Sequence, residues 1–166
     1  FDKVARLLGF SKYLGGVELS KNAATCRKNT LMGRLPRPMI DREGYDVSFS
    51  GLKTATKRLL EKEKPDVNVL ACEFETSVVD VLISKTIKAI NNTGAKTLIL
   101  GGGVSANIPL RTRLKQAAED LGAKVYLPPL KYCGDNASYI ASAAYFNNVP
   151  RNIATVKANP SLGIMD

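Results

Sequence analysis

The chain has 166 residues, 45% of them hydrophobic, which is enough for one domain or slightly more with a real core. It has no apolar run that could span a membrane and no charged-then-apolar leader, so we expect a soluble cytoplasmic protein without membrane contacts. Histidine is absent and the formal charge is +9, which excludes the commonest general base and suits a polyanionic partner or simple solubility.

The amino-terminal third is predicted to be helical with one long loop. A short helix is expected over Asp2 to Leu8, followed by a turn at residues 13–16 and a polar helix from Val17 to Lys28. Residues 28–47 contain two prolines and no clear period, which indicates a loop. Ser50 is expected to cap a helix over residues 51–63.

A long amphipathic helix is predicted from Asp66, its amino-terminal cap, to about Asn92, where Gly94 ends it. Apolar residues recur along it at helical spacing, so one face is expected to be core and not a cofactor site. That stripe comprises Val67, Leu70, Ala71, Phe74, Val78, Val81, Leu82 and Ala89.

The chain is organised around residues 97–107, which read TLILGGGVSAN. A short apolar run, typical of a buried parallel strand, is followed by three glycines and by a helix that begins near Asn107 and stops at Gly122. A second strand (124–127), loop (128–134) and helix (135–147) follow. Strand, helix and strand imply a parallel pair with a right-handed crossover.

Both loops therefore leave the same carboxyl edge of one sheet, where open α/β sheets bind ligands. We expect Asn107 and Asp135 to stand side by side on that edge. A role as helix caps would place the same residues there, and a glycine loop after a strand is a weak motif for a phosphate or ribose.

Three cysteines, Cys26, Cys72 and Cys133, lie far apart and are expected to be free thiols in a reducing cytosol. Basic residues gather between Arg27 and Lys64, where ten Lys+Arg stand against five acids. Such a segment is either a solvated face or a surface for tRNA or phosphate, and in the second case affinity should fall steeply with salt.

Six blocks in this order resemble one family, the TsaD family of tRNA adenosine threonylcarbamoyltransferases, formerly described as O-sialoglycoprotein endopeptidases. The blocks are FDKVARLLG at 1–9, GG at 15–16, LPRPM at 35–39, FSGLKTA at 49–55, GGVSAN at 102–107 and CGDNA at 133–137. The resemblance is to the bacterial type. It covers the carboxyl-terminal half of the family only, without the HxxxH helix and the phosphate loop of the first half, and the chain begins at Phe1, so we expect a fragment.

The resemblance implies an α/β fold, the carboxyl-terminal portion of an actin-like (ASKHA) ATPase-type fold. It would be mostly helical, with a small parallel sheet and a helical insert. Residues 1–94 would form the insert and the long helix of the second actin-like domain, and residues 95–148 the remaining βαβα unit. Residues 149–166 would be a tail that packs on the first domain.

The resemblance also implies a reaction. Family members move threonylcarbamoyl from an adenylate to N6 of the adenosine 3′ of the anticodon in ANN-decoding tRNAs. Asp135 would be one ligand of an Fe²⁺ or Zn²⁺ ion, because a carboxylate suits either metal. Asn107 would contact the adenine, Asp2 the ribose hydroxyls, and Gly16 would let backbone face the nucleoside. No catalytic residue besides this ligand is expected in the chain.

Two features depart from the family pattern. Tyr13-Leu14-Gly15-Gly16 stands where Tyr-Pro-Gly-Gly is usual, and Ser20 stands where an acidic residue is common, so no second ribose contact is expected there.

The expected ligands are an adenine nucleotide or threonylcarbamoyl-AMP. The expected partners are tRNA, the amino-terminal half and proteins of the TsaB and TsaE type, and without that half the chain is expected to be inactive. One alternative is a non-catalytic nucleotide-binding or assembly module, whose open sheet edges could drive self-association. A metalloendopeptidase, suggested by the older family description, lacks any HExxH motif here.

Overall fold

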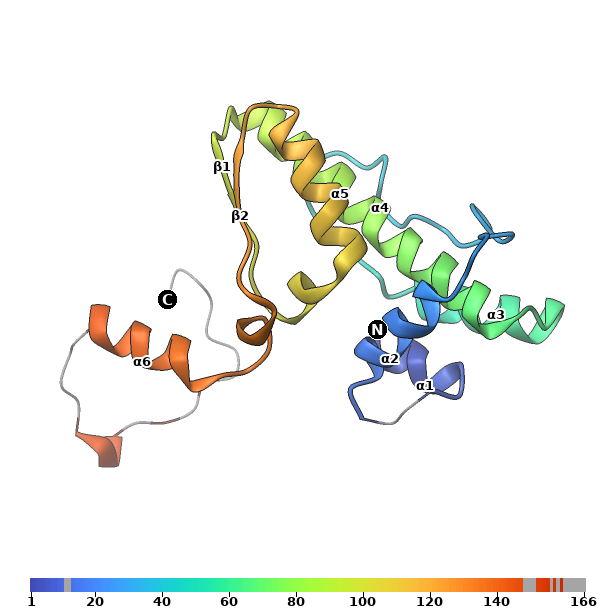
Figure 1. Cartoon of the computed structure of the whole chain (residues 1–166), viewed down its shortest axis with the longest axis horizontal. Coiled ribbons are helices and arrows are strands. Elements are labelled where there is room, and N and C mark those ends of the chain that lie inside the picture. The colour runs from blue at the N-terminus through green and yellow to red at the C-terminus, as the bar shows by residue number, and fades with distance from the viewer. Residues whose placement is uncertain (11–12, 148–151, 156, 158, 160–166) are drawn as a thin grey trace.

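The computed structural model describes residues 1–10, 13–147, 152–155, 157 and 159 (Figure 1). The described part is mostly helical, with one small parallel sheet. The helices are α1 (Asp2–Leu7), α2 (Gly15–Ala24), α3 (Leu52–Glu63), α4 (Val67–Thr93), α5 (Ile108–Glu119) and α6 (Ala137–Phe146). The strands are β1 (Thr97–Ile99) and β2 (Lys124–Tyr126), and the 3-10 turns are η1 (Gly103–Ala106), η2 (Leu130–Tyr132) and η3 (Ile153–Thr155). Most of the predicted tail, 149–166, lies outside the described residues.

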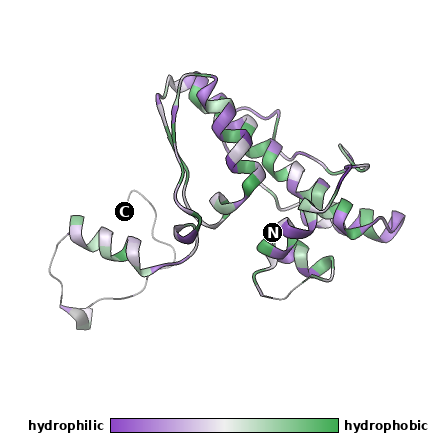
Figure 2. Cartoon of the chain, viewed as in Figure 1, coloured by the Kyte–Doolittle hydropathy of each residue, from purple (hydrophilic) through white to green (hydrophobic). Residues whose placement is uncertain are grey.

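Helix α4 is the long central element, against which α2, α3 and α5 pack (Figure 1). It begins as predicted, because the Asp66 carboxylate accepts hydrogen bonds from the Asn68 and Val69 N–H groups at 2.8 and 3.1 Å. It ends at Gly94, which takes the left-handed conformation (φ 67°). Hydrophobic and hydrophilic residues alternate along α4 and α5 in Figure 2, as expected of helices with one packed face.

Two regions of core lie along α4. Near its start the predicted stripe packs with α1, α2 and α3, in a cluster that includes Val4, Leu19, Leu52, Leu70 and Phe74. Towards its end, smaller clusters join α4 to α5 and to one face of the sheet. The amphipathic reading of α4 is confirmed.

The sheet is a parallel pair in which Leu98 lies opposite Val125, so the predicted strand–helix–strand unit is confirmed. Leu98 and Val125 face the helices. The expectation of a buried strand at the start of residues 97–107 was wrong, because Ile99 is 74% exposed on the opposite face, where Tyr126 of β2 is 47% exposed. No described element covers that face.

Two helices begin differently from the prediction. Helix α2 starts at Gly15, inside the predicted turn, and ends at Ala24, where the Thr25 hydroxyl bonds to the Asn22 carbonyl. Ser50 does not cap α3. Its hydroxyl bonds to Ser48 instead, and Gly51 precedes the helix without a side-chain cap.

The loop over residues 28–47 is held on α4 by a buried carboxylate. Glu73 is completely buried, and its Oε1 accepts hydrogen bonds from the Gly33 and Leu35 N–H groups at 3.0 and 3.2 Å. Its Oε2 accepts a bond from Asn29 Nδ2 at 2.9 Å, and Arg37 Nη1 forms a close ion pair with Oε1. This loop therefore has a fixed position without regular secondary structure.

A second acidic residue of α4 extends the network. Asp80 binds Arg37 through Nε and Nη2, and it binds Arg113 of α5 at 2.7 Å. Burial alone would lower the pKa of Arg37, but its bonds and charge interactions with Glu73 and Asp80 raise it overall. The buried Lys85 donates to the Arg42 carbonyl and so fastens the far end of the loop.

No helix in the described ranges is both long and apolar enough to cross a membrane.

Candidate functional site

Asp2 and Gly16, which lie on consecutive helices, are brought into direct contact. The Gly16 N–H donates a hydrogen bond to Asp2 Oδ1 at 2.7 Å. A Cβ at Gly16 would lie 3.2 Å from the Phe1 Cβ, and one at Gly15 would lie 3.0 Å from the Ala5 Cβ. A side chain at either position would be tightly placed, so the glycine pair favours the close approach of α1 and α2 that puts the Asp2 carboxylate against a backbone N–H.

Asn107 stands at the start of α5 and is nearly buried, with 9% exposure. Its Oδ1 accepts the Leu110 N–H at 2.9 Å, so it caps α5 as the sequence allowed. Its Nδ2 donates to Glu75 Oε1 of α4 at 2.6 Å and to Ser20 Oγ of α2 at 3.2 Å. Both amide hydrogens are used, so the orientation of this side chain is fixed by three elements.

The glycine loop between β1 and α5 is exposed. A Cβ at Gly101 or Gly103 would meet no atom within 4 Å, so packing among the described residues does not demand glycine at either position. Gly102 has a φ of 78°, which glycine adopts without strain. The open backbone is compatible with close approach of a ligand.

Arg111, one turn into α5, joins the two loops at the carboxyl edge of the sheet. Its Nη1 donates to the Ser105 carbonyl at 2.8 Å and lies 3.6 Å from Cys133 Sγ, and its Nη2 donates to the Pro128 carbonyl at 2.8 Å. Arg111 therefore links the two loops that carry Asn107 and Asp135, and the expectation that these two residues stand side by side stays a prediction.

Asp135 is exposed and has no described hydrogen-bond or ion-pair partner. The sequence predicted that Asp135 would begin this helix, but α6 begins at Ala137 and Asn136 is its cap, with Oδ1 accepting the Tyr139 N–H at 3.2 Å. The Asp135 carboxylate is therefore not used as a cap and remains available at the sheet edge.

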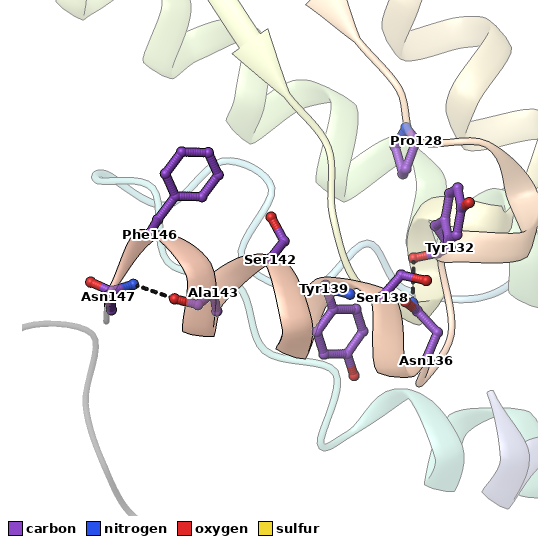
Figure 3. Close-up of a pocket in the computed structure, with 9 residues that line it drawn as sticks. All are labelled: Pro128, Tyr132, Asn136, Ser138, Tyr139, Ser142, Ala143, Phe146 and Asn147. Carbon is purple, nitrogen blue, oxygen red and sulfur yellow. Dashed lines mark hydrogen bonds between the residues drawn. The ribbon is translucent and has the colours of Figure 1, made fainter. Parts of the chain in front are cut away.

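Beside it lies a hollow of about 570 Å³ between α6 and the loop after β2 (Figure 3). Figure 3 shows Tyr132 and Asn136 at one end of this hollow and Phe146 at the other.

Among the described residues, no group of three or more His, Cys, Asp or Glu side chains could hold a metal ion. A single free carboxylate fits a hard divalent cation as one ligand only. The remaining donors of the predicted iron or zinc site would have to come from another segment, in accord with the absence of histidine here.

Two separate contacts involve the predicted residues, one between Asp2 and Gly16 and one between Asn107 and Ser20, and Asp135 contacts none of the other three among the described hydrogen bonds. Asp2 binds Gly16, and Ser20 lies one turn further along the same face of α2, where it meets Asn107. Arg111 then links this loop to that of Asp135. Sequence reasoning missed Glu75 and Arg111, and it did not foresee the bond between Ser20 and Asn107, since its only statement on Ser20 concerned a ribose contact. The only signal for Glu75 was a carboxylate placed between apolar positions of α4.

The three cysteines are unpaired, as predicted. Cys133 is buried beneath Arg111, where its thiol faces the Pro128 and Pro129 carbonyls. Burial, followed by the adjacent Cys26, raises the pKa of Cys72 from 9.0 to about 11. Cys72 is therefore a neutral, weakly nucleophilic thiol at physiological pH.

Comparison with known proteins identifies the family of this chain. A profile of the TsaD family, described as tRNA N6-adenosine threonylcarbamoyltransferase, matches residues 1–142. The chain belongs to the TsaD family.

Three bacterial relatives, each a tRNA N6-adenosine threonylcarbamoyltransferase, illustrate the similarity. The chain is 40% identical to that of Thermosipho africanus over 99% of its length, and 44% identical to that of Lactobacillus delbrueckii subsp. bulgaricus over 98%. It is 43% identical to that of Listeria innocua over the full length of the present chain. It spans only about half of each of these relatives, with 50%, 48% and 50% covered.

Proposed function

We propose that this chain is the carboxyl-terminal part of a transferase that moves threonylcarbamoyl from threonylcarbamoyl-AMP to N6 of an adenosine in tRNA, 3′ of the anticodon. In this reaction a bond forms between N6 and the carbamoyl carbon, and the bond from that carbon to the AMP phosphate oxygen breaks. AMP leaves with the electron pair and N6 releases one proton. The parallel pair with α5 would be the remaining part of an actin-like domain.

The residues of this chain would bind and orient the adenylate. Asp2 Oδ1 already accepts a hydrogen bond from the Gly16 N–H, and the second carboxylate oxygen can accept a hydrogen bond from a ribose hydroxyl. Both Nδ2 hydrogens of Asn107 are donated within the described protein. Its Oδ1 has two lone pairs and accepts one described bond, so a second lone pair remains for a ligand. That lone pair can accept from the exocyclic amino group of adenine.

Asp135 would supply one carboxylate to a divalent iron or zinc ion, completed by ligands from the amino-terminal half. When bound, the metal would polarise the carbamoyl oxygen or orient the adenylate phosphate. The role of this chain is to hold the carboxylate at the sheet edge, and Arg111 fixes the loop that precedes it.

The observation that supports this proposal best is the pair of polar contacts made by the predicted binding residues, Asp2 with the Gly16 N–H and Asn107 with Ser20. Helix α2 carries both Gly16 and Ser20, so the two contacts lie one helical turn apart on the same helix.

The test is reconstitution. This chain is produced together with the amino-terminal half of the Lactobacillus delbrueckii relative, and transfer of labelled threonylcarbamoyl to tRNA is measured. We expect transfer only when both halves are present, and a loss of more than about tenfold in Asp135→Asn, as typical for a metal ligand. Robust transfer by this chain alone would contradict the proposal.

A second candidate, a non-catalytic assembly module, is favoured by the sheet face that no described element covers. Ile99 and Tyr126 are exposed there, and a two-stranded sheet is marginal without further pairing. If this reading holds, the isolated chain dimerises in light scattering, and Ile99→Lys makes it monomeric. A monomer at high concentration would remove the basis for this candidate.

A further inference from the structure

A second hollow lies beside α1, and Asp2, which contacts Gly16, is part of its lining. It has a volume of about 420 Å³ and is lined by α1, by the start of α3 and the residues before it, and by α4. The helices α1 and α3 contact each other at the same end of α4 (Figure 1). Of the residues that line the hollow, only Asp2 belongs to the proposed adenylate site.

Its rim is strongly basic. Lys3 and Arg6 of α1 and Lys53 of α3 all line it, all three are exposed, and none forms an ion pair with a described residue. The single acidic residue of the lining is Asp2, whose Oδ1 accepts the Gly16 N–H. Three uncompensated cations around one concavity attract an anion with more than one charge.

The start of α3 adds to this positive potential. No side chain caps its first turn, and Gly51 precedes the helix. The free N–H groups and the positive end of the helix dipole therefore lie next to Lys53 at the rim.

The lining of the hollow is aromatic. Phe49 is half-buried, and Phe74 is buried in an edge-to-face contact with Phe1 at a centroid distance of 5.4 Å. Cations beside aromatic rings are the combination that binds an unpaired nucleotide, with the phosphate on the cations and the base against a ring. Neither a bare phosphate nor a purely apolar ligand would use both parts.

We propose that this hollow binds unpaired nucleotides of an RNA loop, next to the adenosine that receives the threonylcarbamoyl group. The inference rests on the proposed function, because it places the RNA relative to the transfer site. Asp2 connects the two. It lines the hollow and also meets Gly16 of α2, the helix whose Ser20 contacts Asn107. A loop with its target base in the site can therefore place a neighbouring nucleotide between Lys3 and Lys53.

Binding of a labelled hairpin RNA with adenosine in its unpaired loop, followed by fluorescence anisotropy, tests the proposal with the chain as it stands. The variant K3E/R6E/K53E removes the basic rim. The control K96E/K115E/K124E lowers the net charge equally, at exposed lysines outside the hollow. We expect the first variant to weaken binding about 10- to 100-fold and to flatten the slope of log affinity against log salt by about 2, while the control changes affinity less than about threefold.

A fully paired RNA of the same length tests the aromatic part. Wild-type chain should prefer the hairpin, and Phe49→Leu, which keeps an apolar side chain, should reduce that preference because stacking is lost. Thermal unfolding of each variant ensures that only folded protein is compared.

Three results would overturn the inference: no binding of the hairpin by the wild-type chain, equal weakening in both triple variants, or equal competition by inorganic phosphate and by unlabelled hairpin. The last would identify a small-anion site. The reconstituted transfer assay separates the two proposals. If only the inference about the hollow is wrong, wild type transfers threonylcarbamoyl and K3E/R6E/K53E does so equally well. If the proposed function is wrong, wild type itself shows no transfer.

Discussion

Glu73 offers the sharpest test of the contacts that hold the loop over residues 28–47 on α4. Replacing it by glutamine keeps the size of the side chain but removes its charge. In wild type the carboxylate has no solvent exposure and accepts four bonds, three at Oε1 and one at Oε2. A glutamine oxygen can replace only one of these two acceptor atoms.

The expected loss of stability follows from that geometry. If the amide oxygen keeps the bonds of Oε1, the new NH₂ group faces Asn29 Nδ2, and two donors oppose each other in a buried position. Asn29 cannot rotate freely, because its Oδ1 already accepts the Leu31 N–H at 3.1 Å. The opposed donors cost about 1–3 kcal/mol, and the weaker, neutral bond to Arg37 costs about 1 kcal/mol more. Glu73→Gln should therefore lower the free energy of unfolding by about 2–4 kcal/mol.

Urea unfolding followed by circular dichroism measures this difference, and Glu61→Gln provides the matched control. Glu61 is on the exposed side of α3, and its only ion pair within the described part of the chain is a 3.6 Å contact with Lys57. An exposed pair of this kind contributes less than about 1 kcal/mol. If Glu73→Gln and Glu61→Gln have the same small effect at an unchanged m value, the buried carboxylate does not anchor the loop.

Three further predictions concern the site and its thiols. Arg111→Lys keeps the charge but loses the forked contacts to both loops, so in the reconstituted enzyme it should lower transfer about 10- to 100-fold. Its loss of stability should be smaller than that of Arg111→Met. Equal transfer by wild type and Arg111→Lys would refute the positioning role. Glu75→Ala should lower the free energy of unfolding, measured in urea, by about 2–3 kcal/mol because Asn107 Nδ2 loses its main acceptor. Glu75→Gln should cost less than about 1 kcal/mol because its amide oxygen can still accept that bond. Similar losses in the two variants would contradict a stabilising bond between Asn107 and Glu75. Because the pKa of Cys72 is raised from 9.0 to about 11, the unfolded chain ionises first, so stability should be unaffected below pH 9.0 and should fall between pH 9.0 and about 11. That fall should be shallower in Cys72→Ala, and the same pH dependence in both proteins would show that other groups cause it.

The features that the sequence predicted well depend on residues close together in the chain. The Asp66 cap uses the N–H groups two and three residues ahead, and Gly94 ends the same helix by its own backbone preference. The apolar period of α4 and the alternation of a strand, a helix and a strand are likewise local patterns, and the handedness rule converts them into a parallel pair. The motifs of the six blocks were also sufficient to indicate the family.

Tertiary structure alone decided which polar groups meet. The bond from Asn107 to Glu75 spans 32 residues and that to Ser20 spans 87, so each depends on how α2, α4 and α5 pack. No local pattern distinguishes a buried glutamate from an exposed one. Nor does a local pattern show that Ile99, which resembles a core residue in sequence, lies on a sheet face that no described element covers. Sequence determined the elements and the order of the motifs. Only packing, which depends on the shapes of distant side chains, determined the contacts between them.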